Sequence, residues 1–124
     1  MRRFALFILL STISLTALAS NLNFLKDSPI SSFDNTDTKL MTKTMYEALN
    51  TLKDGDKLAW KNDKTGNSGL SSPTKSYEEH GKTCRSLRMV NRSKKAVSES
   101  VHEFCKGTNN KWELYIEPQT REKE

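Results

Sequence analysis

The sequence predicts an α+β domain in which one N-terminal helix packs on a small antiparallel sheet of about four to five strands, with a disulfide-stapled hairpin. Three observations lead to this fold class. One apolar stripe has a helical period, short strand-like pieces separated by turn residues follow it, and two cysteines, Cys84 and Cys105, can face each other across a hairpin. A helix followed by a run of strands is typical of a helix that covers one face of a sheet.

The helix is predicted over residues 36–52. Apolar residues three or four positions apart form a single stripe there, namely Met41, Met45, Ala48, Leu49 and Leu52. The first free amides of the helix can be capped by Asn35, Thr36 or Asp37, and Gly55 is placed to end the last turn. The stripe is expected to face the core, and a methionine-rich peptide groove is the alternative.

Strands are predicted at 57–61, 70–77, 82–90, 96–105 and 111–116. Turn-forming residues occupy 62–69, where Gly66 and Gly69 can adopt positive φ. Pro73 suits an edge strand or the margin of one, because proline cannot donate to a ladder. In the last strand apolar residues alternate with polar ones, which predicts a half-buried strand with Trp112, Leu114 and Ile116 on one face.

The two cysteines suggest a register for the middle hairpin. If Cys84 lies opposite Cys105, Ser93 faces Ala96 and Lys94-Lys95 forms the turn. The turn has no Gly or Asn at its centre, so a longer loop that starts at Asn91 is the alternative. In the chain-entropy model, closing this loop would stabilise the domain by roughly 3 kcal/mol.

The N-terminus has the three parts of a secretory signal. Arg2 and Arg3 precede the apolar segment 4–15, and Ala17-Leu18-Ala19 is a small-x-small cleavage site. The segment is shorter than the ~20 residues that a spanning helix needs, and an uncleaved N-terminal anchor is the alternative. Ser20 stands where a lipoprotein would have its cysteine. We therefore predict a signal peptide at 1–19 and no stable membrane span after its cleavage.

The remaining chain is expected to form one small domain. Cleavage after Ala19 would leave 105 of the 124 residues, and the loss of Arg2 and Arg3 would lower the net charge from +5 to +3. We predict a polar spacer at 20–35, the α+β domain at 36–117 and a flexible tail at 118–124. Only 35% of the residues are hydrophobic, so the core is expected to be thin and a covalent crosslink useful.

The cysteines have a second possible role as zinc ligands. Two histidines and two cysteines form a set that zinc binds readily: His80, Cys84, His102 and Cys105. Because His102 and Cys105 are three residues apart, their side chains would leave opposite faces of a strand. An oxidising compartment also favours the disulfide, so neither a metal nor another cofactor is expected.

Catalysis is not expected either. A Cys-His hydrolase needs a free thiolate, and here the nearest partner of each thiol is the other thiol. The acidic pairs Glu78-Glu79 and Glu99 with Glu103 resemble scattered surface charge more than a glycosidase dyad. The chain is therefore predicted not to be an enzyme.

The hairpin carries a group of basic residues that could bind an anion. It comprises Lys82, Arg85, Arg88, Arg92, Lys94 and Lys95. Such a group could contact phosphate, lipopolysaccharide, a cell-wall polymer or an acidic protein, and solvated charge that guards a strand edge is the alternative. Nucleic acid is not expected, because no interleaved aromatic platform accompanies the charges. With the turn region before them, the candidate binding residues are Trp60, Asn62, Arg85, Arg88, Arg92, Lys94 and Lys95.

An ordered series of short motifs runs through residues 45–114. It consists of Tyr46-Glu47-Ala48-Leu49, Trp60-Lys61-Asn62, Thr65-Gly66-Asn67-Ser68-Gly69 with Pro73-Thr74, Gly81-Lys82-Thr83-Cys84-Arg85, Phe104-Cys105-Lys106 and Lys111-Trp112-Glu113-Leu114. In this series the chain resembles the C-terminal domain of the rickettsial-type seventeen-kilodalton surface-antigen family of bacterial envelope proteins. The chain lacks the lipobox cysteine and glycine-zipper segment common in that family, so membrane anchoring is not carried over. Ser86-Leu87 also replaces a common aromatic, and a turn glycine is displaced to Gly107.

The resemblance implies an envelope protein without a settled biochemical activity. We therefore expect a non-enzymatic exported bacterial envelope protein, either partner-binding or an accessory component of an envelope assembly. The alternative is a small periplasmic inhibitor or ligand-binding module that acts on a cell-wall enzyme or polymer. The expected partner is an envelope protein or a cell-wall or lipopolysaccharide polyanion. The expected location is the periplasm or the exterior, with peripheral association with the outer membrane as an option.

Overall fold

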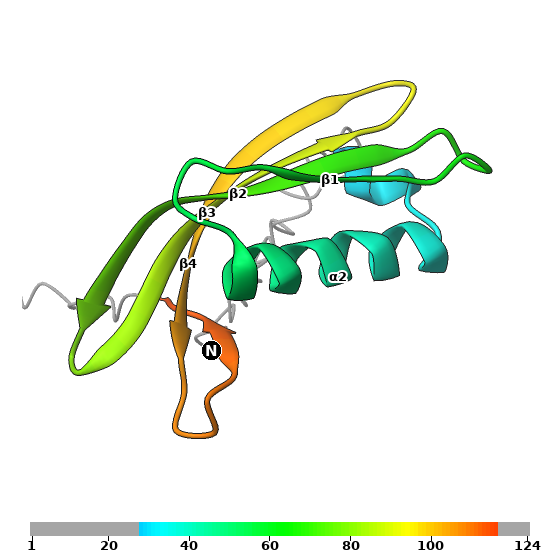
Figure 1. The fold of residues 1–124 in the computed structure, drawn as a ribbon. Coiled ribbons are helices and arrows are strands. Elements are labelled where there is room, and N and C mark those ends of the chain that lie inside the picture. The colour runs from blue at the N-terminus through cyan, green and yellow to red at the C-terminus, as the bar shows by residue number, and fades with distance from the viewer. Residues whose placement is uncertain (1–27, 117–124) are drawn as a thin grey trace, which may run out of the picture.

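The computed structural model describes residues 28–116, and it has the α+β architecture (Figure 1). One α-helix lies along one side of a curled five-stranded sheet. The strands are all antiparallel and follow the order β1-β2-β3-β4-β5, so each strand pairs with its neighbour in sequence. The predicted fold class is confirmed in these features: one helix, five antiparallel strands and a disulfide within the sheet.

The elements lie within a few residues of the predicted ones. In chain order they are η2 (a 3₁₀ helix, Pro29–Ser32), α2 (Asn35–Thr51), β1 (Leu58–Lys61), β2 (Ser68–Glu79), β3 (Lys82–Arg92), β4 (Val97–Lys106) and β5 (Trp112–Leu114). The predicted signal peptide at 1–19 and tail at 118–124 lie outside the described residues. Part of the predicted spacer is described and packs on the domain, because Pro29 is buried and the Phe33 ring meets the Trp60 ring edge-on at 5.2 Å.

The ends of α2 differ from the predicted caps. Asp34 is the N-cap, and it forms a capping box with Asp37, in which each side chain accepts a hydrogen bond from the other residue's backbone N–H. At the other end Leu52 is an extended C-cap with ψ 146°. Gly55 adopts φ +93° in the turn that follows and donates its N–H to the Pro73 carbonyl at 2.7 Å.

The apolar stripe of α2 faces the core, as predicted. Ala48 and Leu49 are buried in one cluster with four sheet residues, and Met41, Met45 and Leu52 pack against it while partly exposed. The four sheet residues are Leu87, Met89, Phe104 and Trp112.

The half-buried pattern expected for the last strand holds only for Trp112. Its indole N–H donates to the Asn50 side chain of α2, whereas Leu114 and Ile116 are 54% and 77% exposed. Regular pairing ends at Leu114, so nothing enforces the alternation beyond that residue.

The predicted register of the middle hairpin is confirmed. Pairing runs from Cys84↔Cys105 to Arg92↔Val97, and the Ser93 N–H donates to the Ala96 carbonyl at 2.9 Å. Lys94-Lys95 therefore forms the turn, and the loop starting at Asn91 is excluded because Asn91 pairs with Ser98.

Pro73 lies where β2 becomes an edge strand. The last residue pair between β1 and β2 is Leu58↔Ser71, and the register with β3 shifts between Pro73 and Lys75. A proline is tolerated at such a position because its missing N–H interrupts no ladder on the open side. The sequence-based placement at an edge or margin is confirmed.

Loss of the disulfide is expected to destabilise the domain by roughly 3 kcal/mol, because the crosslink restricts the unfolded chain. The test is urea unfolding of the wild type, with and without reductant, and of the Cys84→Ser/Cys105→Ser double variant. Reductant should lower the stability of the wild type to that of the double variant and leave the double variant unchanged. Equal stability of wild type and double variant under oxidising conditions would contradict the expectation.

Candidate functional site

A buried carboxylate organises the loop between β1 and β2. Asp37, in the first turn of α2, has no exposed surface. Its two oxygens accept hydrogen bonds from the side chains of Asn62, Thr65 and Asn67, each at 2.8 Å. The backbone N–H of Asp34 donates a fourth, at 3.0 Å. The loop is thereby fixed to the start of the helix by side chains distant in sequence.

The hydrogen bonds keep this carboxylate ionised despite its burial. Burial alone raises the pKa of Asp37, because a charge loses its hydration. The hydrogen bonds from Asn67, the Asp34 backbone, Thr65 and Asn62 outweigh that effect and lower the pKa to about 2. The negative charge is consequently part of the folded structure at neutral pH.

The same loop is closed by its own backbone. The N–H of Asn62 donates to the Asn67 carbonyl and the N–H of Gly66 donates to the Asn62 carbonyl, at 2.9 and 2.8 Å. Gly66 adopts φ +75°, as expected for a turn glycine. Gly69 lies inside β2 instead, and it is needed because a Cβ there would come within 2.5 Å of the Trp60 indole nitrogen.

Trp60 and Asn62 are therefore components of the fold. Their exposed fractions are 6% and 7%, Trp60 packs against Phe33, and Asn62 binds Asp37. The structure brings these two predicted binding residues to the loop, yet their side chains are already engaged inside the domain.

Arg85 is likewise turned inward and binds the C-terminal end of α2. It is 9% exposed, and its guanidinium donates to the carbonyls of Ala48, Leu49 and Leu52 at 3.3, 2.8 and 2.7 Å. It also donates to the Ser76 hydroxyl and pairs with Asp54 at 2.8 Å. The hydrogen bond from Arg85 is the largest cause of the lowered pKa of Asp54. We therefore leave Arg85 out of the binding surface.

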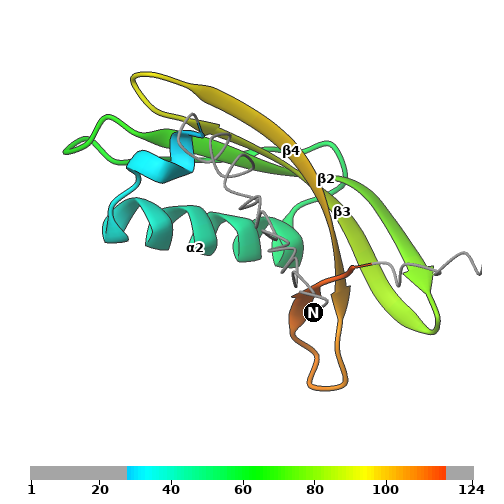
Figure 2. The same ribbon diagram turned by 180° about the vertical axis from the view of Figure 1, so that it is seen from behind.

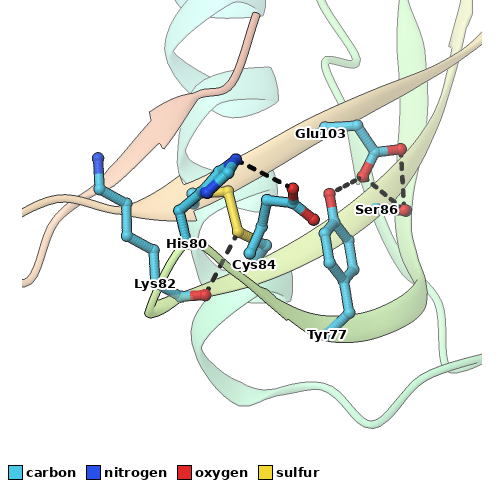
Figure 3. Close-up of a disulfide and its surroundings, with 8 residues drawn as sticks. Tyr77, His80, Lys82, Cys84, Ser86 and Glu103 are labelled. Carbon is cyan, nitrogen blue, oxygen red and sulfur yellow. Dashed lines mark hydrogen bonds and ion pairs between the residues drawn. A yellow bond between two sulfur atoms is a disulfide. The ribbon is translucent and has the colours of Figure 1, made fainter. Parts of the chain in front are cut away.

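The opposite face of the hairpin surrounds the disulfide with hydroxyl and carboxyl groups (Figure 3). Glu103 accepts hydrogen bonds from Tyr77 at 2.6 Å and from Ser86 at 2.6 and 2.9 Å. The bond to Glu103 and burial raise the pKa of Tyr77 to about 12. Arg88 pairs with Glu99 nearby and lowers the pKa of that carboxyl. Both acidic residues are thus held by neighbours.

The zinc ligand set is not assembled. Cys84 and Cys105 form a disulfide, with Cα atoms 4.0 Å apart. His102 pairs with Leu87, so its side chain lies on the opposite face of the sheet from the Cys84↔Cys105 pair. The His80 Nε2 atom lies 3.3 Å from Oε1 of Glu79. Within residues 28–116 no group of three or more His, Cys, Asp or Glu side chains could hold a metal ion, and no helix is long and apolar enough to cross a membrane.

Arg92, Lys94 and Lys95 remain. Arg92 is exposed at the end of β3, and the two lysines lie beside a cavity. The cavity, of about 680 Å³, is bounded by the hairpin tip 93–96, by Thr65 and Asn67 of the loop, and by serines at η2. Figure 1 shows these segments at the same end of the sheet. The Lys94 side chain reaches to 3.5 Å from the position that a Cβ on Gly66 would take. Neither lysine forms an ion pair with a carboxylate in the described part of the chain.

The fold and this site define a disulfide-bonded α+β domain whose loops build a cavity bordered by basic residues. In comparisons with known proteins, no family model, no curated protein and no solved structure matches the chain. The functional argument therefore rests on the geometry and the sequence.

Replacement of Asp37 by asparagine is expected to cost about 3 kcal/mol at pH 7, because buried donors lose a charged acceptor. In the wild type the charge contributes about 2 kcal/mol above roughly pH 4, and this is lost as the pH falls toward the folded pKa of about 2. Urea unfolding at pH 7 and pH 2.5 measures both effects. The control is Asp63→Asn, whose side chain is 89% exposed. A pH dependence unchanged by Asp37→Asn would contradict this assignment.

Arg85→Lys is expected to destabilise the domain by about 2 kcal/mol, because an ammonium group cannot reproduce the forked contacts of a guanidinium. Thermal unfolding followed by circular dichroism measures the effect. Arg92→Lys serves as the control, since Arg92 is exposed at the end of β3. Similar melting temperatures for the two variants would show that the helix end does not depend on Arg85.

Proposed function

We propose that this protein is a non-enzymatic, exported bacterial envelope protein that binds an anionic polymer of the envelope, as an accessory component there. The observation that carries the proposal is the pair Lys94 and Lys95 at the rim of a preformed cavity. Two ammonium groups that have no carboxylate partner within residues 28–116 attract phosphate and carboxylate groups, which lipopolysaccharide and cell-wall polymers carry at high density.

The position of the lysines supports binding over edge protection. Lysines that guard a sheet lie along an unpaired strand edge. Lys94 and Lys95 lie in the turn between β3 and β4, where there is no ladder to guard. Their charges are thus directed at the end of the domain, beside the cavity.

The rigidity of the walls also supports a binding site. Thr65 and Asn67 are held by the Asp37 carboxylate, and the hairpin tip is closed by the bond between Ser93 and Ala96. A surface that is ordered before the ligand arrives loses little conformational entropy on binding.

Export is supported by the signal-like N-terminus and by the disulfide, which persists in oxidising compartments. The envelope location rests on the resemblance to the surface-antigen family. The second candidate, a small ligand-binding module, is supported by the cavity volume, which lies in the range of small-molecule sites.

The test is the Lys94→Gln/Lys95→Gln double variant, measured for binding to purified lipopolysaccharide and to peptidoglycan fragments. We expect at least a roughly tenfold loss of affinity, and wild-type binding that weakens with added salt. The matched control, Lys82→Gln/Lys111→Gln, removes the same charge from two exposed positions away from the cavity, at the start of β3 and just before β5. Equal losses in both variants would indicate unspecific attraction, and no binding by the wild type to either polymer would refute the proposal.

A further inference from the structure

One edge of β4 is without a neighbouring strand over most of its length. On one side β4 pairs with β3 from Val97 to Cys105. On the other side β5 pairs only with Phe104, Cys105 and Lys106, and a last hydrogen bond joins the Tyr115 N–H to the Glu103 carbonyl at 2.8 Å. Figure 2 shows β4 as the outer strand along the upper part of the sheet. Residues 97–102 therefore form an open edge within the described structure.

The register identifies which backbone groups face outward. The Cys84↔Cys105 pair has Cα atoms 4.0 Å apart, as in the closely spaced, non-hydrogen-bonded pairs of an antiparallel ladder. The backbone groups of Cys105 therefore point away from β3, and this direction repeats at every second residue of the strand. The N–H and C=O groups of Glu103, Val101 and Glu99 point away from β3 in the same way. The bond from Tyr115 to the Glu103 carbonyl agrees with this parity. Val101 and Glu99 thus present two donors and two acceptors to an added strand.

Apart from the charge of Glu99, this edge lacks the features that block strand addition. The open edge of β2 has Pro73, a register shift and Lys75. The open edge of β4 reads Val-Ser-Glu-Ser-Val-His over 97–102, with neither proline nor lysine and with an unbroken register. Val97 and Val101 are 60% and 56% exposed, so apolar side chains are available on one face of this edge.

We propose that this edge of β4 is a docking site for an extended segment of a partner protein, which adds to the sheet as an antiparallel sixth strand. Recognition by strand addition uses main-chain hydrogen bonds for affinity and alternate side chains for specificity. The Glu99 side chain lies between the two valines on the same face of the sheet, and it remains 57% exposed although it pairs with Arg88. The added strand should therefore carry a basic residue opposite Glu99 and apolar residues opposite Val97 and Val101.

A second copy of this chain fits the edge less well. In a two-fold symmetric dimer, the two copies of β4 would pair antiparallel with the same face of each sheet on the same side. Such a register has one residue that lies opposite its own copy. A centre at Glu99 places two Glu99 side chains opposite each other, and a centre at Val101 places Glu99 opposite Glu103. A centre at Ser100 places Glu99 opposite Val101. Glu99 already pairs with Arg88 of its own sheet. None of these registers adds a second basic partner to Glu99, whereas a basic segment of another protein does.

The first measurement is amide hydrogen exchange of the free full chain. The N–H groups of Glu99 and Val101 should exchange fast, while those of Ser100 and His102, which face β3, should be protected. Protection of Glu99 and Val101 in the free protein would show that the edge is already covered and would overturn the proposal. This site does not depend on Lys94 and Lys95, so the two proposals can fail separately.

The second measurement is binding of the peptide acetyl-Thr-Ile-Thr-Lys-Thr-Ile-amide, which places lysine opposite Glu99 and isoleucine opposite both valines. We expect binding that protects the Glu99 and Val101 amides, and about a tenfold weaker affinity when the peptide's lysine is replaced by glutamate. No binding, or equal binding of both peptides, would overturn the proposal.

Two variants test the assigned geometry. Val101→Pro removes an outward N–H and leaves the ladder with β3 intact, so binding should be lost while the fold is retained. Glu99→Lys changes an exposed side chain and should reverse the preference between the two peptides. This variant tests the site even if the proline variant does not fold. Unchanged binding by Val101→Pro, or an unchanged preference in Glu99→Lys, would refute this edge as the site.

Discussion

The structure depends on the ionised carboxylate of Asp37, which is buried and surrounded by donors. A charge without exposed surface is tolerated only when hydrogen bonds replace its hydration, and four donors do so here. Three of these donors come from one loop, so the carboxylate holds the loop in the observed conformation. That conformation sets the entry into β2, the position of Thr65 and Asn67, and with them one wall of the cavity beside the hairpin tip.

A second polar clamp acts at the other end of the same helix. Arg85 reaches from β3 to the last carbonyls of α2, as Asp37 in the first turn reaches the loop after β1. The negative group is at the helix N-terminus and the positive group at its C-terminus, which is the favourable arrangement for the helix dipole. Because the apolar cluster is small, these two directional contacts specify how the helix lies on the sheet more narrowly than hydrophobic contact alone would.

Features governed by local periodicity or strand parity could be predicted from the sequence. The core stripe of α2 follows from residue spacing, and the register of the hairpin follows from placing Cys84 opposite Cys105. The roles of Asn62 and Arg85 could not be predicted, because their partners lie 25 to 37 residues away and an arginine in a basic run looks the same whether it is buried or exposed. Its residue type makes Asp37 a possible cap, and the Asp34-x-x-Asp37 spacing is the one sequence signal of the capping box. The hydrogen bonds between Asp37 and the loop have no signal in the sequence.

The engaged side chains also narrow the question of function. Trp60, Asn62 and Arg85 serve the fold, and Arg88 is paired with Glu99. Of the predicted binding residues this leaves Arg92, Lys94 and Lys95 at the tip of the hairpin, and the open edge of β4 is a second candidate surface. The two regions adjoin at Val97 but differ in their physical chemistry. Attraction by Lys94 and Lys95 is screened by salt, whereas main-chain bonds along β4 are far less sensitive to it. Ionic strength therefore separates the two surfaces: binding that disappears in salt belongs to the tip, and binding that persists belongs to the edge.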